Sequence, residues 1–331
     1  MGKKDKTFYA GVDLGGTSFV AIVTDSKGRI LGTKEDKTQV KKGDPNPIID
    51  QLVAAIKKAA KKADVKVKDL AAIGIGPAGA VNTQTGVVHY APNLGWEEVP
   101  LADRIKSALG VDTYIDNDVH VAIRGEHGLG AAEGTKNAAA IWVGTGVGGG
   151  IVINGELYVG GRGSAGEIGH TIVMIDGPQC KCGNKGCVEA LSSRTSMERM
   201  VREEAEKGRR SRALQIMEEA GKPRMTSSVI DKALKEKDEV MTEVFQKAQL
   251  AIGILTANLV NTLDPEVVVI GGGIAERMGE TFVAPIRDHA YRMFLQKAHK
   301  EKVRIVPTKL GGHAGAVGAA LLAKQMSNGH C

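Results

Sequence analysis

The chain has 331 residues, enough for two domains of ordinary size, and its 42% hydrophobic and 25% charged residues are typical of globular proteins. No apolar run approaches the roughly eighteen residues of a membrane span, and no apolar signal region precedes the first strand. We therefore expect a cytoplasmic protein without membrane contact. The net charge of +6 includes lysine pairs such as Lys57-Lys58 on the outer face of an expected helix, without interleaved aromatic residues, which argues against nucleic-acid binding.

Glycine turns between apolar strands organise the first part of the chain. Residues 8–31 predict a strand, a Gly-Gly turn, a second strand, a turn at Lys27-Gly28 and a third strand. The elements expected next are a helix from about Pro47 to Ala63, a buried strand at 70–76, a loop up to Trp96, a short helix at 101–109 and a strand at 112–115.

The strand–turn–strand pattern restarts at residue 138. Val12, Gly15 and Val20 align with Val143, Gly146 and Ile151, which suggests two related α/β domains facing a cleft. A polar, helical stretch is expected from 192 to 257. A buried strand then runs into a glycine turn within 265–274, and 313–325 reads as a closing helix with a small-residue face.

Three glycine turns are candidates for phosphate binding, because exposed N–H groups can point at an anion where no Cβ intervenes. They lie at 13–17 (DLGGT), 144–146 (GTG) and 271–273 (GGG). The chain contains no GxxxxGK[ST] P-loop, and the formal GxGxxG beginning at Gly144 continues into a strand instead of a helix, so its context excludes a dinucleotide fingerprint. A hairpin turn with an acidic residue at its base suits a nucleotide triphosphate and Mg²⁺, although each turn alone reads equally as an ordinary hairpin.

Asn117 and Asp118 directly follow a strand and open an expected helix. An aspartate there can serve as a helix cap or as the base that accepts a hydroxyl proton.

Three of the four cysteines, Cys180, Cys182 and Cys187, lie within CKCGNKGC. A cytoplasmic location argues against a disulfide, and the C-x-C spacing does not match a thioredoxin-like motif. Together with His170, ten residues upstream, they offer the three thiolates and one imidazole of a closed, structural zinc site. We interpret Cys331 as an incidental free thiol.

Seven motifs, in this order and spacing, resemble the ROK family (bacterial repressors, open reading frames and sugar kinases): DLGGT, PNLGW, NDV, GTGVGGG, SAGEIGH, CKCGNKGCVE and IGGGI. The resemblance runs from Asp13 to the closing helix. It implies an α/β, two-domain actin-like ATPase (ribonuclease H-like) fold with a central cleft. We expect a smaller domain of residues 1–118 and 313–331, and a larger one of residues 119–312 that carries the zinc site.

The resemblance also implies an ATP-dependent sugar kinase, with ATP, Mg²⁺ and Zn²⁺ as cofactors and glucose as the sugar. It makes Asp118 the catalytic base. The sugar contacts it implies are Gly79, Asn93, Asn117, Asp118, Glu167, His170 and Glu189. The nucleotide contacts it implies are Asp13, Gly15, Gly16, Thr17, Gly144, Thr145, Gly146, Gly271, Gly272 and Gly273. The zinc ligands in the family's positions are His170, Cys180, Cys182 and Cys187.

Two alternatives stay open. The first is a kinase for another hexose, such as fructose, N-acetylglucosamine or N-acetylmannosamine, although PNLGW favours the glucokinase branch. The second is a sugar-sensing regulator without a DNA-binding domain, since twelve residues before Asp13 are too few for a helix-turn-helix domain. His120 departs from the family, in which many relatives carry Asn, and the family implies a homo-oligomer, either a dimer or a tetramer.

Overall fold

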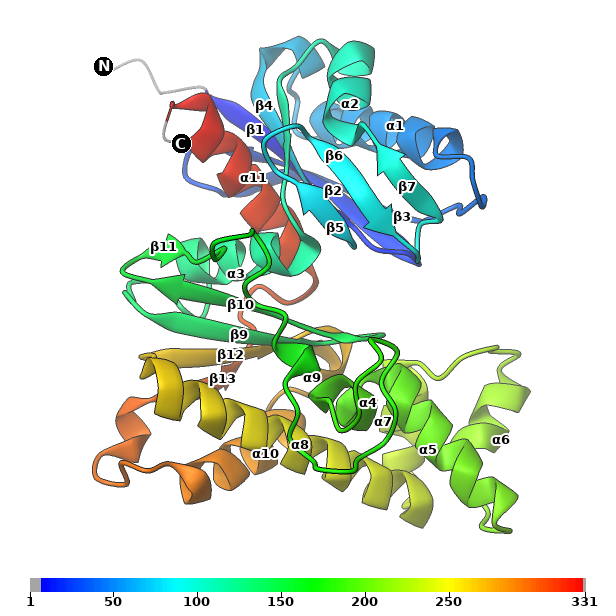
Figure 1. Cartoon of the computed structure of the whole chain (residues 1–331). Helices are drawn as coiled ribbons and strands as arrows, with labels where there is room; N and C mark the ends of the chain where they lie inside the picture. Colours follow the sequence, from blue (N-terminus) through cyan, green and yellow to red (C-terminus); the bar gives the residue numbers. More distant parts are fainter. Residues whose placement is uncertain (1–6, 330–331) are drawn as a thin grey trace. The chain divides into compact units, whose positions relative to one another are not determined.

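The structure, a computed structural model, describes residues 7–329, so Cys331 lies outside the described residues. It divides into two compact units, Met1–Gly134 with His313–Cys331 and Thr135–Gly312 (Figure 1). Residues 119–134 thus join the first unit, whereas the boundary expected from the sequence lay after residue 118. The reason is helix packing, because α3 (Asp118–Leu129) packs extensively against α11 (Ala314–Ser327).

The first unit is built on a mixed five-stranded sheet in the order β3-β2-β1-β4-β8. The first three strands form the antiparallel meander predicted from the glycine turns, and β4 and β8 run parallel to β1. Besides α3, α11 and a small second sheet, the elements of this unit are β1 (Phe8–Leu14), β2 (Ser18–Asp25), β3 (Ile30–Lys37), α1 (Asn46–Lys62), a 3₁₀ turn (Val67–Asp69), β4 (Leu70–Pro77), α2 (Leu101–Leu109) and β8 (Thr113–Ile115).

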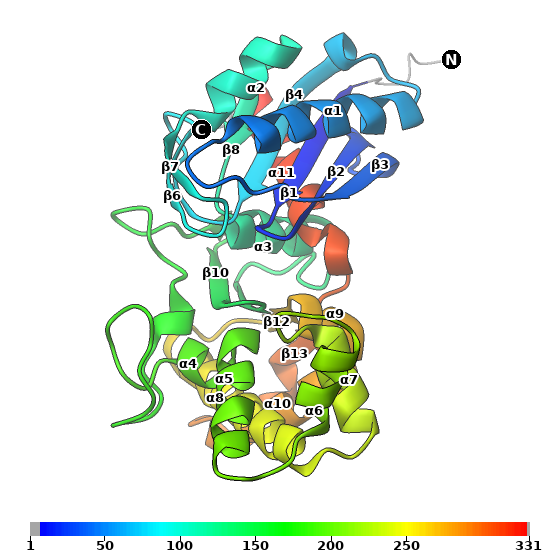
Figure 2. The same cartoon turned by 90° about the vertical axis from the view of Figure 1, so that its right-hand side faces the viewer.

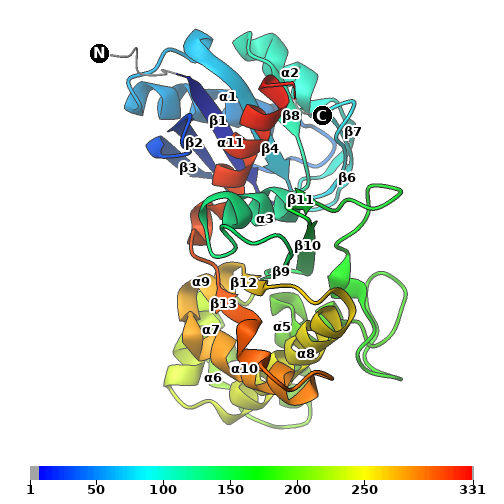
Figure 3. The same ribbon diagram turned by 90° about the vertical axis from the view of Figure 1, so that its left-hand side faces the viewer.

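Helices cover both faces of this sheet. α1 lies on one face, and α11 lies on the other (Figure 2; Figure 3). α1 buries Ile48, Leu52 and Ile56, at the helical spacing seen in the sequence. On the opposite face a Cβ at Gly11 or Gly74 would overlap the backbone of α11, so these glycines let the closing helix lie directly on the strands.

A small antiparallel sheet, β5 (Ala80–Asn82), β6 (Val87–Ala91) and β7 (Trp96–Val99), occupies the stretch expected to be a loop. That expectation was wrong for these residues. The strands bury Val88, Trp96 and Val99 in the core of the first unit. Strands of three to five residues with exposed polar positions give too short an alternation to be recognised in the sequence.

The second unit is built on a sheet in the order β11-β10-β9-β12-β13. Its first three strands are antiparallel, and β12 and β13 run parallel to β9, the same arrangement as in the first unit. The internal likeness predicted from the glycine turns is therefore confirmed. The strands are β9 (Ala138–Val143), β10 (Val147–Ile153), β11 (Glu156–Leu157), β12 (Val267–Gly271) and β13 (Arg304–Pro307).

Helices supply most of the core of the second unit. The 25-residue α8 packs against α10 beneath the sheet (Figure 1). None of the described helices is both long and apolar enough to cross a membrane. The helices and 3₁₀ turns of this unit are a 3₁₀ turn at Ile168–His170, α4 (Val188–Ser192), α5 (Arg194–Glu206), α6 (Arg212–Glu219), α7 (Ser227–Lys235), α8 (Glu239–Leu263), α9 (Gly273–Met278), α10 (Glu280–Met293) and a 3₁₀ turn at Lys300–Lys302.

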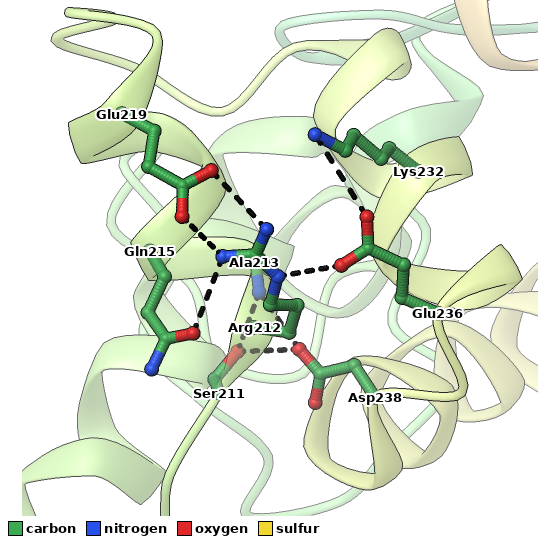
Figure 4. A network of polar contacts seen from close by, with 8 residues as sticks. All are labelled: Ser211, Arg212, Ala213, Gln215, Glu219, Lys232, Glu236 and Asp238. Carbon is green, nitrogen blue, oxygen red and sulfur yellow. Dashed lines mark hydrogen bonds and ion pairs between the residues drawn. The ribbon is translucent and has the colours of Figure 1, made fainter.

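One buried carboxylate joins the starts of two of these helices (Figure 4). Asp238 Oδ2 accepts hydrogen bonds from the Ser211 hydroxyl at 2.7 Å and from the Ala213 N–H at 2.8 Å, at the start of α6. Its Oδ1 accepts from the Met241 N–H at 3.1 Å, at the start of α8. Nearby, Arg212 forms partly exposed ion pairs with Glu219 and Glu236.

We expect Asp238→Ala to lower the free energy of unfolding by about 2–4 kcal/mol, because it removes the N-cap of α8 and the buried acceptor of the Ser211 hydroxyl, and leaves the Ala213 N–H with Ser211 as its one side-chain acceptor. Arg212→Ala, which removes partly solvated ion pairs in the same network, should lower it far less, because solvent screens these charges. Urea unfolding followed by circular dichroism measures both values. Equal losses for the two variants would contradict the capping role of Asp238.

Candidate functional site

The predicted site residues of the first unit gather at one edge of its sheet. β1, β4 and β8 are parallel, so their carboxyl ends meet at this edge, where α/β proteins bind ligands. The Ala78 N–H donates to Leu14 O at 2.9 Å, and the Asp116 N–H donates to Ile75 O at 3.1 Å. These bonds bring the segments that follow the three strands together.

The turn at residues 13–17 joins β1 to β2. Asp13 is the penultimate residue of β1, and a Cβ at Gly315, in the first turn of α11, would overlap its carboxylate. The acid therefore lies at the positive end of a helix dipole. Gly16 packs closely against Asn93, since a Cβ there would lie 2.7 Å from the Asn93 Cβ. The structure thus places a predicted sugar residue beside the predicted phosphate turn.

Asn117, and not Asp118, caps helix α3. Its Oδ1 accepts hydrogen bonds from the Val119 N–H at 2.9 Å and the His120 N–H at 3.3 Å. Its Nδ2 donates to Gly79 O at 3.1 Å, which places Gly79, another predicted sugar contact, beside Asn117. Asp118 is the first residue of the helix, and its carboxylate is not needed as the cap.

The carboxyl group of Asp118 lies in a poorly solvated position, although the residue as a whole is partly exposed. Burial raises its pKa to about 6, against the opposing effects of the Val119 N–H and the nearby His120. The ring of His120 is held by buried Asp116, with 3.0 Å between Nδ1 and Oδ1. A raised pKa in a carboxylate at a sheet edge is typical of a general base that works near neutral pH.

The turn at 144–146 joins β9 to β10 in the second unit and closes through a Gly144 N–H to Gly146 O bond of 2.9 Å. Glu189, in the first turn of α4, lies against it and accepts a hydrogen bond from the Val147 N–H at 2.9 Å. A Cβ at Gly146 would overlap the same carboxylate. Only glycine allows Glu189 this close to the turn.

The turn at 271–273 lies beside the 144–146 turn in the same sheet. β12 ends at Gly271 next to β9, and a Cβ at Gly272 would lie 2.5 Å from Val143 O. Gly272 has φ +86°, a conformation that favours glycine, and it precedes the first residue of α9. Two of the three predicted phosphate turns are therefore adjacent, and one opens a helix.

The four predicted metal ligands form one cluster within the described residues. The ligand atoms of His170, Cys180, Cys182 and Cys187 all lie within 4.8 Å of one another, and the cysteines are not in disulfides. The Cys182 and Cys187 sulfurs are 3.7 Å apart, and Cys180 Sγ is 3.7 Å from His170 Nδ1. A tetrahedral zinc with Zn–S bonds of about 2.3 Å requires ligand separations of about 3.8 Å, so the residues fit the ion.

Burial supports a cation at this cluster. It raises the pKa of Cys187 to about 12, so a thiolate there requires a compensating positive charge. Glu167 lies close by and is exposed, with its carbonyl accepting from the His170 N–H at 3.1 Å. Within the second unit, the cluster thus contains one predicted sugar residue, His170, and lies close to a second, Glu167.

Two features of the site escaped prediction. Arg194 donates from Nη2 to the Thr145 hydroxyl at 2.9 Å, and Asp116 orients His120 behind the candidate base. Neither belongs to a glycine motif. A basic residue at the start of a helix, where cations are unfavourable, is the one sequence signal that could have singled out Arg194.

Two sheets of identical order, each with a glycine turn between a pair of antiparallel strands, define the actin-like ATPase fold that sugar kinases share. The chain belongs to the ROK family, whose sequence profile matches residues 9–326.

Individual relatives include both enzymes and regulators. The glucokinase of Halalkalibacterium halodurans is 35% identical over 97% of this chain and 96% of its own length. A putative xylose repressor of Caldicellulosiruptor sp. is 33% identical over 96% of this chain and 78% of its own length. A ROK family glucokinase from Streptomyces griseus, solved with glucose and AMPPNP, matches with a TM-score of 0.81 and 33% identity, over 96% of this chain and 99% of that chain.

Proposed function

We propose that the protein is an ATP-dependent glucokinase that transfers the γ-phosphoryl group of ATP directly to the 6-hydroxyl of glucose. The observation that carries the proposal is Asp118, a poorly solvated carboxylate of raised pKa that is not required as a helix cap. Phosphoryl transfer to a hydroxyl needs positioning, charge neutralisation and one proton acceptor, and this residue supplies the acceptor.

Sugar recognition is proposed for polar residues of both units. Asn93, Asn117 and Asp118 would contact glucose from the first unit, and Glu167, His170 and Glu189 from the second. Gly79 contributes by holding the Asn117 amide through its carbonyl. Carboxylates and amides paired with vicinal hydroxyls discriminate strongly against analogues that lack one of those hydroxyls.

Nucleotide binding is proposed for the three glycine turns. Their N–H groups would bind phosphate oxygens, and Asp13 would face the hydration shell of the nucleotide's Mg²⁺. Bound Mg²⁺ supplies charge neutralisation at the transferred phosphoryl group. A single structural Zn²⁺ is proposed at the His170–cysteine cluster.

A panel of hexoses with Mg-ATP, scored by ADP release, tests this function. We expect glucose to give the highest kcat/KM among glucose, fructose, N-acetylglucosamine and N-acetylmannosamine. Faster turnover of another hexose would replace the substrate but keep the kinase. The similarity to a repressor supports one rival, a sugar-responsive regulator. Glucose binding in calorimetry without ADP release on any hexose would favour that rival.

The raised pKa of Asp118 predicts an acidic limb in the pH profile. The base must be ionised to accept the hydroxyl proton, and below a pKa of about 6 its ionised fraction falls tenfold per pH unit. We expect kcat/KM for glucose to be constant above about pH 7 and to fall with unit slope below about pH 6. Measuring at saturating Mg-ATP keeps protonation of the nucleotide out of the profile. A flat profile to about pH 5 would contradict this role.

A further inference from the structure

Three hydrogen bonds tie the start of α5 to the 144–146 turn, one from Thr195 and two from Arg194. The backbone N–H of Arg194 donates to Gly144 O at 3.0 Å, and its Nη2 donates to the Thr145 hydroxyl at 2.9 Å. The Thr195 hydroxyl donates to Thr145 O at 2.8 Å. The start of α5 and the candidate phosphate turn are therefore one hydrogen-bonded unit, with a guanidinium beside it.

The charge of Arg194 lacks a counter-ion. Between residues 7 and 329, no carboxylate lies within ion-pair distance of it, and its buried Nε has no hydrogen-bond partner. The other two arginines of α5 are both paired, Arg199 with Glu203 at 2.6 Å and Arg202 with Glu198 at 2.8 Å. Burial lowers the pKa of Arg194, and Glu276 acts on it only through its more distant charge.

The position of this cation is unfavourable without a bound anion. Arg194 is the first residue of the 13-residue α5, where the helix dipole repels positive charge. A half-buried guanidinium also loses hydration that its neutral partner Thr145 cannot replace. A polyanion at the adjacent 144–146 and 271–273 turns would relieve both costs and would satisfy the guanidinium donors with phosphate oxygens.

We propose that Arg194 binds the polyphosphate of the nucleotide, as a phosphate-binding residue alongside the glycine turns. The identity of the anion rests on the proposed kinase function. The contact adds a positive charge at the phosphate donor, so its energetic effect increases with the number of phosphates on the ligand.

Calorimetry with ATP, inorganic tripolyphosphate and adenosine tests the assignment. Arg194→Gln should weaken binding of ATP and of tripolyphosphate by about 10- to 100-fold and change adenosine binding less than about twofold. Arg202→Gln, on the same helix but already neutralised by Glu198, should leave all three affinities unchanged. Equal weakening of ATP and adenosine, or unchanged ATP affinity, would overturn the proposal.

Arg194→Lys provides the second variant in case the glutamine variant fails to fold. Lysine keeps the charge but cannot reproduce the planar fork, so ATP affinity should fall by about 3- to 10-fold with adenosine affinity unchanged. Unchanged ATP affinity in this variant also counts against the proposal.

Failure of the inference is distinguishable from failure of the kinase proposal. If the wild-type protein phosphorylates no hexose but the Arg194→Gln variant binds ATP more weakly than the wild type, the phosphate contact is supported and the kinase function is removed. A chain that phosphorylates glucose, and whose glutamine variant binds ATP normally, would do the reverse.

Discussion

Asp118→Asn should lower kcat for glucose phosphorylation by about 10²–10⁴-fold while glucose and ATP still bind. The substitution keeps the size of the side chain and its ability to accept hydrogen bonds, but it removes the proton acceptor. Helix α3 should remain intact because its cap is Asn117. Steady-state kinetics and calorimetry on the same preparation separate turnover from binding.

Asp112→Asn is a matched control for this variant. Asp112 is an exposed carboxylate six positions earlier and pairs with Lys106 at the surface. We expect turnover within about twofold of the wild type, because exposed ion pairs of this kind contribute little. Near-normal turnover of Asp118→Asn would remove Asp118 from the mechanism and leave the proposed base unidentified.

The meanders and glycine turns were predictable because they depend on local pattern. Short apolar runs around Val12 and Val143, each followed by a glycine turn at Gly15 or Gly146 and a second apolar run, indicate two hairpins without any long-range information. The zinc cluster was predictable for a similar reason. Three of its four ligands lie within one eight-residue loop, so little folding is needed to bring them together.

The unit boundary depends on contacts between segments far apart in sequence. A Cβ at Gly125 or Gly318 would overlap backbone on the partner helix, so α3 and α11 approach each other through glycines about 190 residues apart. No local pattern near residue 118 reveals that packing. The same holds for Arg194, whose partner Thr145 lies 49 residues earlier in the chain.

Acid–base chemistry at the site was only partly visible in the sequence. The Asn117-Asp118 pair indicates a cap or a base, and only the structure shows that Asn117 accepts the capping bonds. The sequence also could not show that the carboxylate of Asp116 contacts the ring of His120, four residues later in the chain. That contact fixes the ring of a residue whose positive charge, when protonated, lowers the pKa of Asp118.

The proposed zinc site makes sugar binding dependent on a metal that takes no part in phosphoryl transfer. Cys187 is the N-cap residue of α4, and Glu189 in the first turn of that helix contacts the 144–146 turn. His170 approaches Cys180 through Nδ1, so a metal bound there leaves Nε2 as a donor of fixed tautomer for a sugar hydroxyl. The loop from 180 to 187 contributes little apolar packing of its own beyond the cysteines.

We therefore expect one zinc per chain, and we expect Cys182→Ser to weaken glucose binding by about 10- to 100-fold while ATP affinity changes far less. Lys181→Ser, an exposed neighbour in the same loop, is the control and should retain both zinc and glucose affinity. Elemental analysis gives the metal content, and calorimetry gives the two affinities. A folded Cys182→Ser protein that lacks zinc and still binds glucose like the wild type would show that the cluster only supports the loop. Parallel loss of ATP binding would indicate instead that the metal stabilises the whole second unit, because the 144–146 turn is held by the same helix α4 that follows Cys187.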